Sequence, residues 1–245
     1  MRIFQAISVT CEYVLHDYLI HLPYFAIRNL LAPLLYLFAF GLGVGALVKS
    51  GTIAYFSYVF PGILLLTVMQ VCYGHFSAEI WLSRRVDKYL ELLMMVAPIR
   101  PVEAVLGYLI AGIIITFFAA ICFLLVAWAI LKTIPFSLGW MAVFATGLAV
   151  FFTAMGIIAG VSFNNPHHKG AADTLLLLPL SFTCGVFFPL DVYPEEIRWL
   201  FYLVPLSQAV EGLREQSIWQ LTYVWSTAIV AALAATYVFR RRLVV

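Results

Sequence analysis

The chain has 245 residues, of which 64% are hydrophobic and only 11% are charged, and its formal net charge is +2. Soluble domains are about half apolar and about a quarter charged, so this composition excludes an ordinary soluble protein and indicates a membrane protein. The small net charge gives no reason to expect a nucleic acid as a partner.

Six long segments without charged residues predict membrane-spanning helices. A helix needs about 20 mostly apolar residues to cross a hydrocarbon layer of about 30 Å. Strands of a membrane barrel would instead alternate apolar and polar residues, and these segments do not. We expect an all-α polytopic membrane protein, a single transmembrane domain over residues 1–245. Its six transmembrane helices are predicted at roughly 29–48, 55–78, 104–131, 140–162, 173–190 and 218–239.

The N-terminal residues 1–28 predict a helix that lies on the membrane surface. Residues 3–25 mix apolar and charged side chains in the way that interfacial helices do, and Pro23 is expected to break this helix before the first span. The segment lacks the short apolar core and the cleavage site of a signal peptide, so we expect it to stay on the mature protein.

Two pairs of glycines spaced four residues apart lie in the first and fourth predicted spans. Gly41 with Gly45, and Gly156 with Gly160, have the GxxxG spacing that lets two helix backbones approach closely. The first pair is not part of a GxGxxG motif, follows no predicted strand and is not followed by the GK[ST] ending of a nucleotide loop. We therefore interpret all four glycines as helix-packing residues.

The stretch RRVDKYLELLMMVAPIRP, which begins at Arg84, concentrates charges in an otherwise apolar chain. On a helix over residues 84–97, apolar side chains share one face, and prolines end the helix. Charged side chains gather on another face: Arg84, Asp87, Lys88 and Glu91. A solvated loop helix whose basic residues set membrane topology is one interpretation. The acidic residues do nothing for topology, which favours a charged face that docks to another protein.

Residues 194–216 predict two short helices on the other side of the membrane. Pro194 suits the first residue of a helix, the two glutamates that follow suit its positive end, and Pro205 separates it from the second helix. At about 10 residues each, these helices are too short to span. We expect a re-entrant pair whose turn is covered by protein.

Lysines and arginines predict the orientation, because short cytoplasmic loops retain them. With both termini in the cytoplasm, most basic residues fall on that side. The four cysteines are far apart and show no CxxC pattern, so neither a disulfide framework nor a metal site is predicted.

The order of these parts resembles the ABC-2 type permease family, the membrane subunits of ATP-binding-cassette exporters, over the whole chain. Within this family, it is most similar to the permeases of nodulation-type lipo-oligosaccharide exporters. The segments that carry the resemblance are PLLYLFAFGLGVG (33–45), YVFPGIL (58–64), KYLELLMMVAPIRPVEAVLG (88–107) and GVFFPLDVYPEEIRWLFYLVPLSQAVEGLRE (185–215).

The resemblance implies that residues 84–97 form a coupling helix, seated in a cleft of a separate ATP-hydrolysing subunit, and that the N-terminal helix is a second contact. The implied interface residues are Arg84, Arg85, Asp87, Lys88, Glu91 and Glu12. Two permease copies, expected to form a homodimer, would bind two ATPase subunits. ATP and Mg would belong to those partners, and no cofactor is expected in this chain. The implied location is the bacterial cytoplasmic (inner) membrane, multi-pass, with both termini cytoplasmic.

The family also points to the second and fifth spans as the substrate path. The residues that would line it are Tyr73, His75, Phe182, Thr183, Phe187 and Phe188. Their aromatic and polar character suits an amphiphile, namely a lipo-oligosaccharide, a lipid-linked glycan or a drug. Aromatic residues also form interface belts, and His75 near Glu79 also fits an interfacial histidine.

Two other function classes stay open. A membrane-embedded lipid-modifying enzyme would usually gather several ionisable residues at one membrane face. A passive channel predicts charged rings or carbonyl filters within the spans. The sequence shows neither pattern, and it does not identify the cargo.

Overall fold

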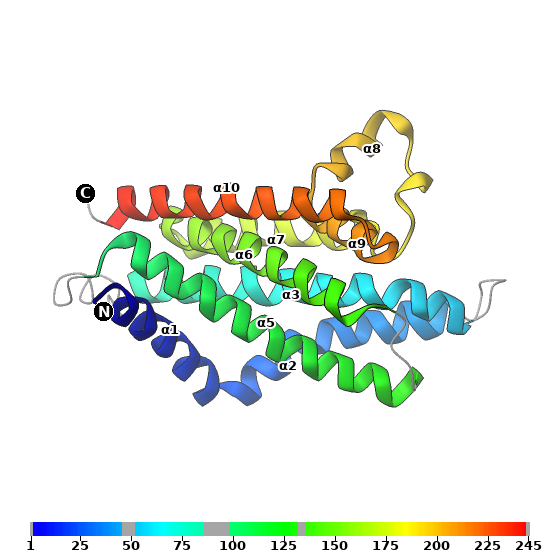
Figure 1. The fold of residues 1–245 in the computed structure, drawn as a ribbon, viewed down its shortest axis with the longest axis horizontal. Helices are drawn as coiled ribbons and strands as arrows, with labels where there is room; N and C mark the ends of the chain where they lie inside the picture. Colours follow the sequence, from blue (N-terminus) through cyan, green and yellow to red (C-terminus); the bar gives the residue numbers. More distant parts are fainter. Residues whose placement is uncertain (1, 46–51, 86–98, 132–135, 244–245) are drawn as a thin grey trace.

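A computed structural model of the chain describes residues 2–45, 52–85, 99–131 and 136–243. All regular structure in these residues is helical (Figure 1). The helices are α1 (Arg2–Ile20), α2 (Leu22–Tyr36), the π-helix η1 (Leu37–Val44), α3 (Thr52–Arg85), α5 (Pro101–Leu131), α6 (Leu138–Ser162), α7 (Pro166–Thr183), the 3-10 helix η2 (Leu190–Val192), α8 (Glu195–Tyr202), α9 (Pro205–Glu215) and α10 (Ile218–Leu243). The all-helical prediction is confirmed for this part of the chain.

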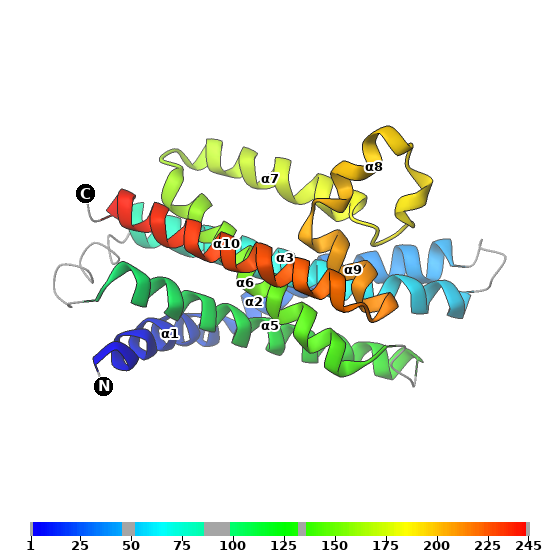
Figure 2. The same cartoon turned by 45° about the horizontal axis from the view of Figure 1, so that its top comes forward.

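The long helices run back and forth along one axis of an elongated bundle. α3, α5, α6, α7 and α10 follow this axis in alternating directions, and both ends of the chain lie at the same end of the bundle (Figures 1 and 2). Four segments of the described residues are long and apolar enough to cross a membrane: Tyr55–Arg85, Pro101–Leu125, Leu138–Ser162 and Ile218–Arg242. They correspond to the second, third, fourth and sixth predicted spans.

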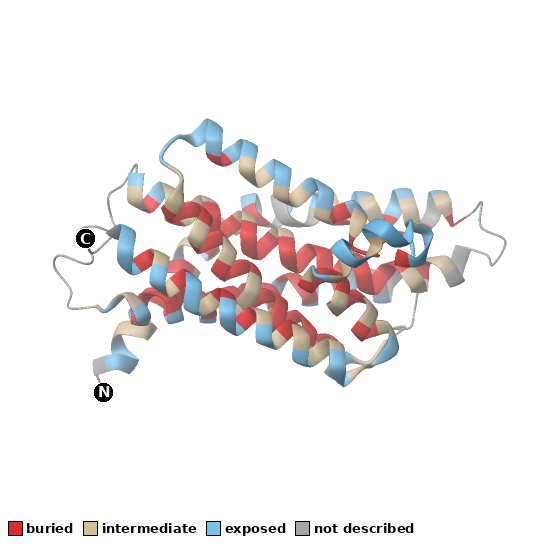
Figure 3. Ribbon diagram, turned by 90° about the horizontal axis from the view of Figure 1, so that it is seen from above, coloured by how far each residue is buried: buried red, intermediate tan, exposed pale blue. Residues whose placement is uncertain are grey.

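The core of the bundle surrounds α3. This helix is apolar on all sides, which is the pattern of a helix that is covered by others rather than lying at a surface. It packs against α6 along much of its length, and α10 covers the other side of α6. Phe60, Met69 and Phe152 are among the fully buried residues there, and Figure 3 shows the burial concentrated in the middle of the bundle.

Glycines allow α6 to approach α3 closely. A Cβ atom at Gly156 would lie 3.0 Å from the carbonyl oxygen of Tyr73, and one at Gly160 would lie 2.9 Å from Cβ of Ile80. At Gly41, in η1, an added Cβ would lie 2.8 Å from the ring of Phe56. The structure therefore places three of the predicted packing glycines at close contacts between elements, and the fourth, Gly45, is buried.

We expect Gly156→Ala to destabilise the protein by roughly 1–3 kcal/mol, because the added methyl group meets backbone atoms of α3 that cannot move independently. Gly74→Ala, on α3 itself, is the matched control, since no atom of a neighbouring element lies within 4 Å of a Cβ atom built at that position. Thermal unfolding of both variants in detergent measures the difference. Equal unfolding temperatures would contradict a tight α3–α6 contact.

The N-terminal region differs from the expected single helix. The chain turns at His21, and α2 begins at Leu22, so Pro23 lies in the first turn of α2 instead of ending α1. Proline is tolerated there because the first turn of a helix needs no backbone donor. The prediction that Pro23 breaks the N-terminal helix was therefore wrong by a few residues. α1 packs against α5, where Thr10 lies against Gly107.

The helix in the region of the fifth predicted span is also displaced from 173–190. α7 starts at Pro166, capped by Asn165, whose Oδ1 accepts a hydrogen bond of 2.8 Å from the amide of His167. It ends at Thr183, because Gly185 adopts a positive φ of 72° that an α-helix cannot contain. The prediction of a helix over 184–190 was therefore wrong for residues 184–189. Leu190 is helical, but it is the first residue of η2.

The predicted helix pair in 194–216 is present, divided where proline was expected to divide it. α8 ends at Tyr202, and α9 begins at Pro205. How deeply the pair enters the membrane stays a prediction.

Candidate functional site

A groove lies between α2, α3 and α7, and we name it the α2–α7 groove. α7 runs along one edge of the bundle (Figure 2) and packs only lightly, against α3. The open space has a volume of about 460 Å³. Its lining combines polar and apolar residues: Ala32, Tyr36, Gln70, Gly74, Asp173, Thr174, Leu177, Leu178 and Ser181.

One wall of the groove carries a charged network, which we name the Asp173 network. Lys169 Nζ lies 2.6 Å from Oδ2 of Asp173, one helical turn along α7. From α3, the hydroxyl of Tyr73 donates to Oδ1 of Asp173 at 2.8 Å, and Ser77 donates to the same oxygen at 3.2 Å. Tyr73 lies within the apolar segment Tyr55–Arg85. The network therefore ties α7 to α3 at a level that this segment would place in the membrane.

Tyr36, which lines the groove, belongs to a cluster of aromatic rings that lies beside it. The ring of Phe187 packs against that of Phe40 in a tilted arrangement, with 4.1 Å between their centroids. Its centroid lies 5.7 Å from that of Phe182. Tyr36 contacts both Phe182 and Phe187, at 6.1 and 5.6 Å. The lining of the groove is therefore polar at Gln70, Asp173 and Thr174 and mostly apolar elsewhere, an arrangement that suits a molecule with a polar and an apolar part.

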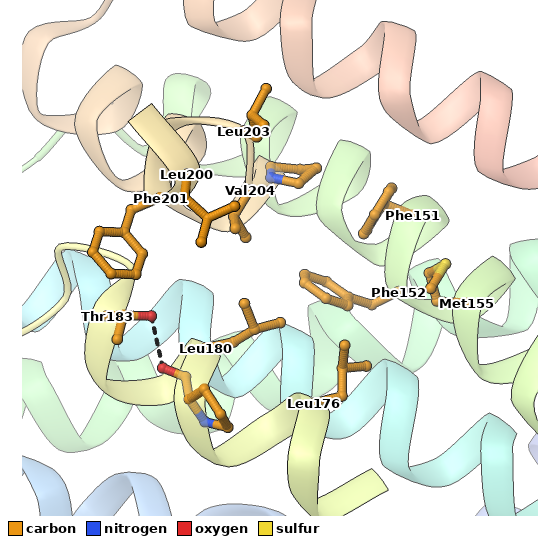
Figure 4. A pocket seen from close by; sticks show the side chains of 12 residues that line it. Phe151, Phe152, Met155, Leu176, Leu180, Thr183, Leu200, Phe201, Leu203 and Val204 are labelled. Carbon is orange, nitrogen blue, oxygen red and sulfur yellow. Dashed lines mark hydrogen bonds between the residues drawn. The ribbon is translucent and has the colours of Figure 1, made fainter. Parts of the chain in front are cut away.

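A second cavity, of about 400 Å³, lies on the opposite side of α7 (Figure 4). Residues of α6, α7 and the α8–α9 pair line it, and nearly all of them are apolar: Phe151, Phe152, Met155, Leu176, Pro179, Leu180, Thr183, Leu200, Phe201, Leu203, Val204 and Pro205. The hydroxyl of Thr183 is occupied locally, because it donates to the carbonyl of Pro179 at 2.8 Å. This cavity offers shape and apolar surface but hardly any polar recognition.

The structure separates the residues that the sequence assigned to the substrate path. Tyr73 contacts the lining of the α2–α7 groove through its hydrogen bond to Asp173, and Phe182 and Phe187 do so through their ring contacts with Tyr36. The ring of Phe188 lies 6.4 Å from that of Phe40. Thr183 instead faces the apolar cavity.

His75 is buried on another side of α3, against Tyr18 and Phe25 at 5.4 and 4.9 Å. The two residues Tyr73 and His75 diverge because positions two apart on a helix point in different directions. Contact of any of the six predicted path residues with a substrate stays a prediction.

Arg214 joins three separate parts of the chain at the opposite end of the bundle from the termini. From α9, its Nη1 donates to the hydroxyl of Tyr58 at 3.0 Å and to the carbonyl of Gly185 at 2.9 Å. Its Nη2 donates to the carbonyls of Tyr58 and Val186 at 3.1 and 3.2 Å. Burial lowers the pKa of Arg214, yet a guanidinium keeps its charge in proteins. The residue fixes the segment after α7 against α3.

Three of the six predicted ATPase-interface residues fall within the described structure. Arg84 is half-buried and donates to the carbonyl oxygens of Val161 and, at 3.3 Å, Arg242, so it ties together the ends of three helices. Arg85 donates to the side chain of Asn164. Glu12 is exposed on α1 and accepts a hydrogen bond from Ser8.

The remaining predicted interface residues, Asp87, Lys88 and Glu91, and with them most of the expected coupling helix 84–97, lie outside the described residues. The binding role of all six residues stays a prediction.

Sequence reasoning missed Lys169, Asp173 and Arg214. Lys169 lies between the fourth and fifth predicted spans, and Asp173 is the first residue of the fifth. Their spacing of four residues after an Asn-Pro pair is nevertheless typical of an ion pair in the first turns of a helix. No comparable signal exists for Arg214, because its partners are 28 to 156 residues away.

Comparison with known proteins identifies a family that this chain matches. Residues 13–217 match the family described as ABC-2 type transporter. The chain is 27% identical over 184 residues to the inner membrane transport permease YadH of Escherichia coli K12, an alignment that covers 74% of this chain and 70% of the relative. The YadH protein of Shigella flexneri is similar to the same extent. Because the family match extends over most of its length, this chain belongs to the ABC-2 type transporter family.

Proposed function

We propose that the chain is the transmembrane permease subunit of an ATP-driven exporter that moves an amphiphile out across the cytoplasmic membrane. The α2–α7 groove carries this proposal, because Gln70, Asp173 and Thr174 place polar groups within an otherwise apolar bundle. Ionisable groups at membrane depth are costly and usually mark a pathway. Family membership, and a relative named as a transport permease, support the transport role. A lipo-oligosaccharide, a lipid-linked glycan or a drug would have the required two-part chemistry.

A second permease copy would complete the groove. Its polar groups would be unfavourable against lipid, while apolar side chains project on both of its sides: Leu35 is 57% exposed on α2 and Leu178 is 51% exposed on α7. Two copies that meet through α2 and α7 would cover these side chains and enclose the polar groove between them. Two separate ATP-binding-cassette subunits would then bind at the end that carries both termini, which we propose to be cytoplasmic.

The first test asks whether water reaches the groove. We expect Thr174→Cys, in a Cys122→Ala background, to react with a charged, membrane-impermeant thiol reagent at least about tenfold faster than Leu233→Cys, because thiolates form in water and not in hydrocarbon. Leu233 is a suitable control because it is 67% exposed, but on the outer face of α10. The three other cysteines are buried. Equal labelling at the two positions would contradict a polar path at the groove.

The second test concerns the ATPase partner. Exchanging the charges of Lys88 and Glu91 preserves both the net charge and the number of basic residues on that side of the membrane. We expect the exchange to reduce copurification of an ATP-binding-cassette subunit from the native host by about tenfold or more, because like charges at an interface cost several kcal/mol. Arg84 is left intact, since its side chain holds helix ends together.

The matched control exchanges Glu195 and Arg198, which have the same spacing on α8 at the other end of the molecule. The ATPase subunit should be retained in this variant, as measured by quantitative mass spectrometry of the purified complex. If the Lys88–Glu91 exchange retained the ATPase subunit with full ATP hydrolysis, the coupling-helix assignment would be wrong.

A further inference from the structure

A polar cavity of about 540 Å³ lies where α6 and α10 end, at the end of the bundle that carries the C-terminus (Figure 1). Ser162, Tyr237, Val238, Arg241 and Arg242 line it. The cavity is separate from the α2–α7 groove and shares no residue with it. Its lining supplies two guanidinium groups and two hydroxyl groups, all of which can donate hydrogen bonds.

Positive charge at this cavity is not neutralised within the described part of the chain. Neither Arg241 nor Arg242 forms an ion pair with any residue that the structure describes, and both are exposed. Arg84 adds a third guanidinium next to them, because it donates to the carbonyl oxygen of Arg242. Planar guanidinium groups bind phosphate oxygens in a bidentate manner, so the cavity favours a phosphate group as its ligand.

An apolar stripe on α10 leads directly to the cavity. Ile229, Leu233 and Tyr237 are 56%, 67% and 64% exposed, and their spacing of four residues puts them in one row that continues to Arg241. In a helix that crosses a membrane, such a row faces acyl chains. A tyrosine followed by arginines is typical of the level where the hydrocarbon meets the headgroups.

We propose that this cavity binds the phosphate headgroup of an anionic phospholipid whose acyl chains lie along the stripe. The arginines would hold the phosphate, and the hydroxyls of Tyr237 and Ser162 would donate to its remaining oxygens. Basic pockets between transmembrane helices are known lipid-headgroup sites. An acidic protein partner could use the arginines but would leave the row from Ile229 to Tyr237 without a role. The inference requires only that α10 crosses the membrane and does not depend on transport or on an ATPase partner.

The test measures phospholipid binding to the full-length chain. The protein, purified in mild detergent, is titrated with phosphatidylglycerol or phosphatidylcholine, and the bound lipid is counted by native mass spectrometry. We expect Arg241→Gln and Arg242→Gln each to weaken phosphatidylglycerol binding about tenfold or more, because each removes a charge-assisted hydrogen bond to the phosphate. Arg240→Gln is the matched control, because it removes the same charge from the same turn but does not line the cavity.

Three results would overturn the proposal: equal retention of phosphatidylcholine, an equal loss in Arg240→Gln, or loss of an ATPase subunit with unchanged lipid binding. Glycerol 3-phosphate serves as the soluble probe of the headgroup alone. It should bind much more weakly than phosphatidylglycerol, and equal binding would show that the stripe contributes nothing. If an arginine variant fails to fold, Tyr237→Phe tests the same site, since it keeps the stripe and removes one donor.

Discussion

Replacing Asp173 with asparagine should lower the free energy of unfolding by about 3 kcal/mol, because it leaves the ammonium group of Lys169 in a nearly buried position without its counter-charge. The two side chains are only 11% and 21% exposed, so solvent would compensate little. Asparagine keeps an oxygen that accepts from Tyr73, so the loss reports on the charge and not on the hydrogen bond. The measurement is thermal or denaturant unfolding of the purified protein in detergent.

The double variant Lys169→Met with Asp173→Asn separates the charge pair from general damage. Removing both charges leaves no unpaired ion, and replacing a buried ion pair by neutral groups is often close to neutral in stability. We therefore expect the double variant to recover most of the stability lost in Asp173→Asn. If the single and double variants were equally unstable, Lys169 and Asp173 would not be coupled, and the loss in Asp173→Asn would not come from an unpaired charge.

Arg214→Lys should loosen the segment after α7, although it conserves the charge. A lysine ammonium is a point charge on a flexible stem and cannot reproduce the planar fork that meets the two carbonyl oxygens of Gly185 and Val186 together with Tyr58. At least one buried acceptor loses its charged donor, and each such loss costs about 1–3 kcal/mol. Hydrogen exchange should rise in residues 184–190 before it rises in the helices.

Arg198→Lys provides the comparison within the same region. Arg198 also donates to backbone carbonyls, those of Asp191 and Tyr193, but lies nearer the surface, where water can replace a lost donor. Its effect on exchange in residues 184–190 should be clearly smaller. If the two variants had the same effect, or if only global stability changed in Arg214→Lys, Arg214 would not specifically hold this segment.

Hydropathy predicted the helices that are long and continuously apolar. α3, α5, α6 and α10 lie within a few residues of the predicted spans. The exception is a helix that continues past its span into a charged end, as α3 does to Arg85. The division between α8 and α9 was also predictable, because proline at 205 cannot continue a helix but can begin one. These features are local consequences of side-chain chemistry.

α7 and the groove could not be predicted in the same way. The first turns of α7 contain Lys169, at which a search for uncharged windows stops, yet its pairing with Asp173 permits it in a helix. The hydroxyl donors to Asp173 come from α3, about 100 residues earlier in the chain. A polar side chain at the edge of a span is interpreted as a loop residue until its distant partners are known.

The contacts of Arg214 set an order in which the protein can be completed during synthesis. Tyr58 and the segment 185–186 emerge from the ribosome before α9 does, so the three parts cannot be joined until Arg214 follows them. Until that moment, the carbonyls of Gly185 and Val186 lack their guanidinium donor. The end of the bundle opposite the termini is therefore held together by one of the last residues to be translated before α10. A chain truncated after α7 would lack these contacts.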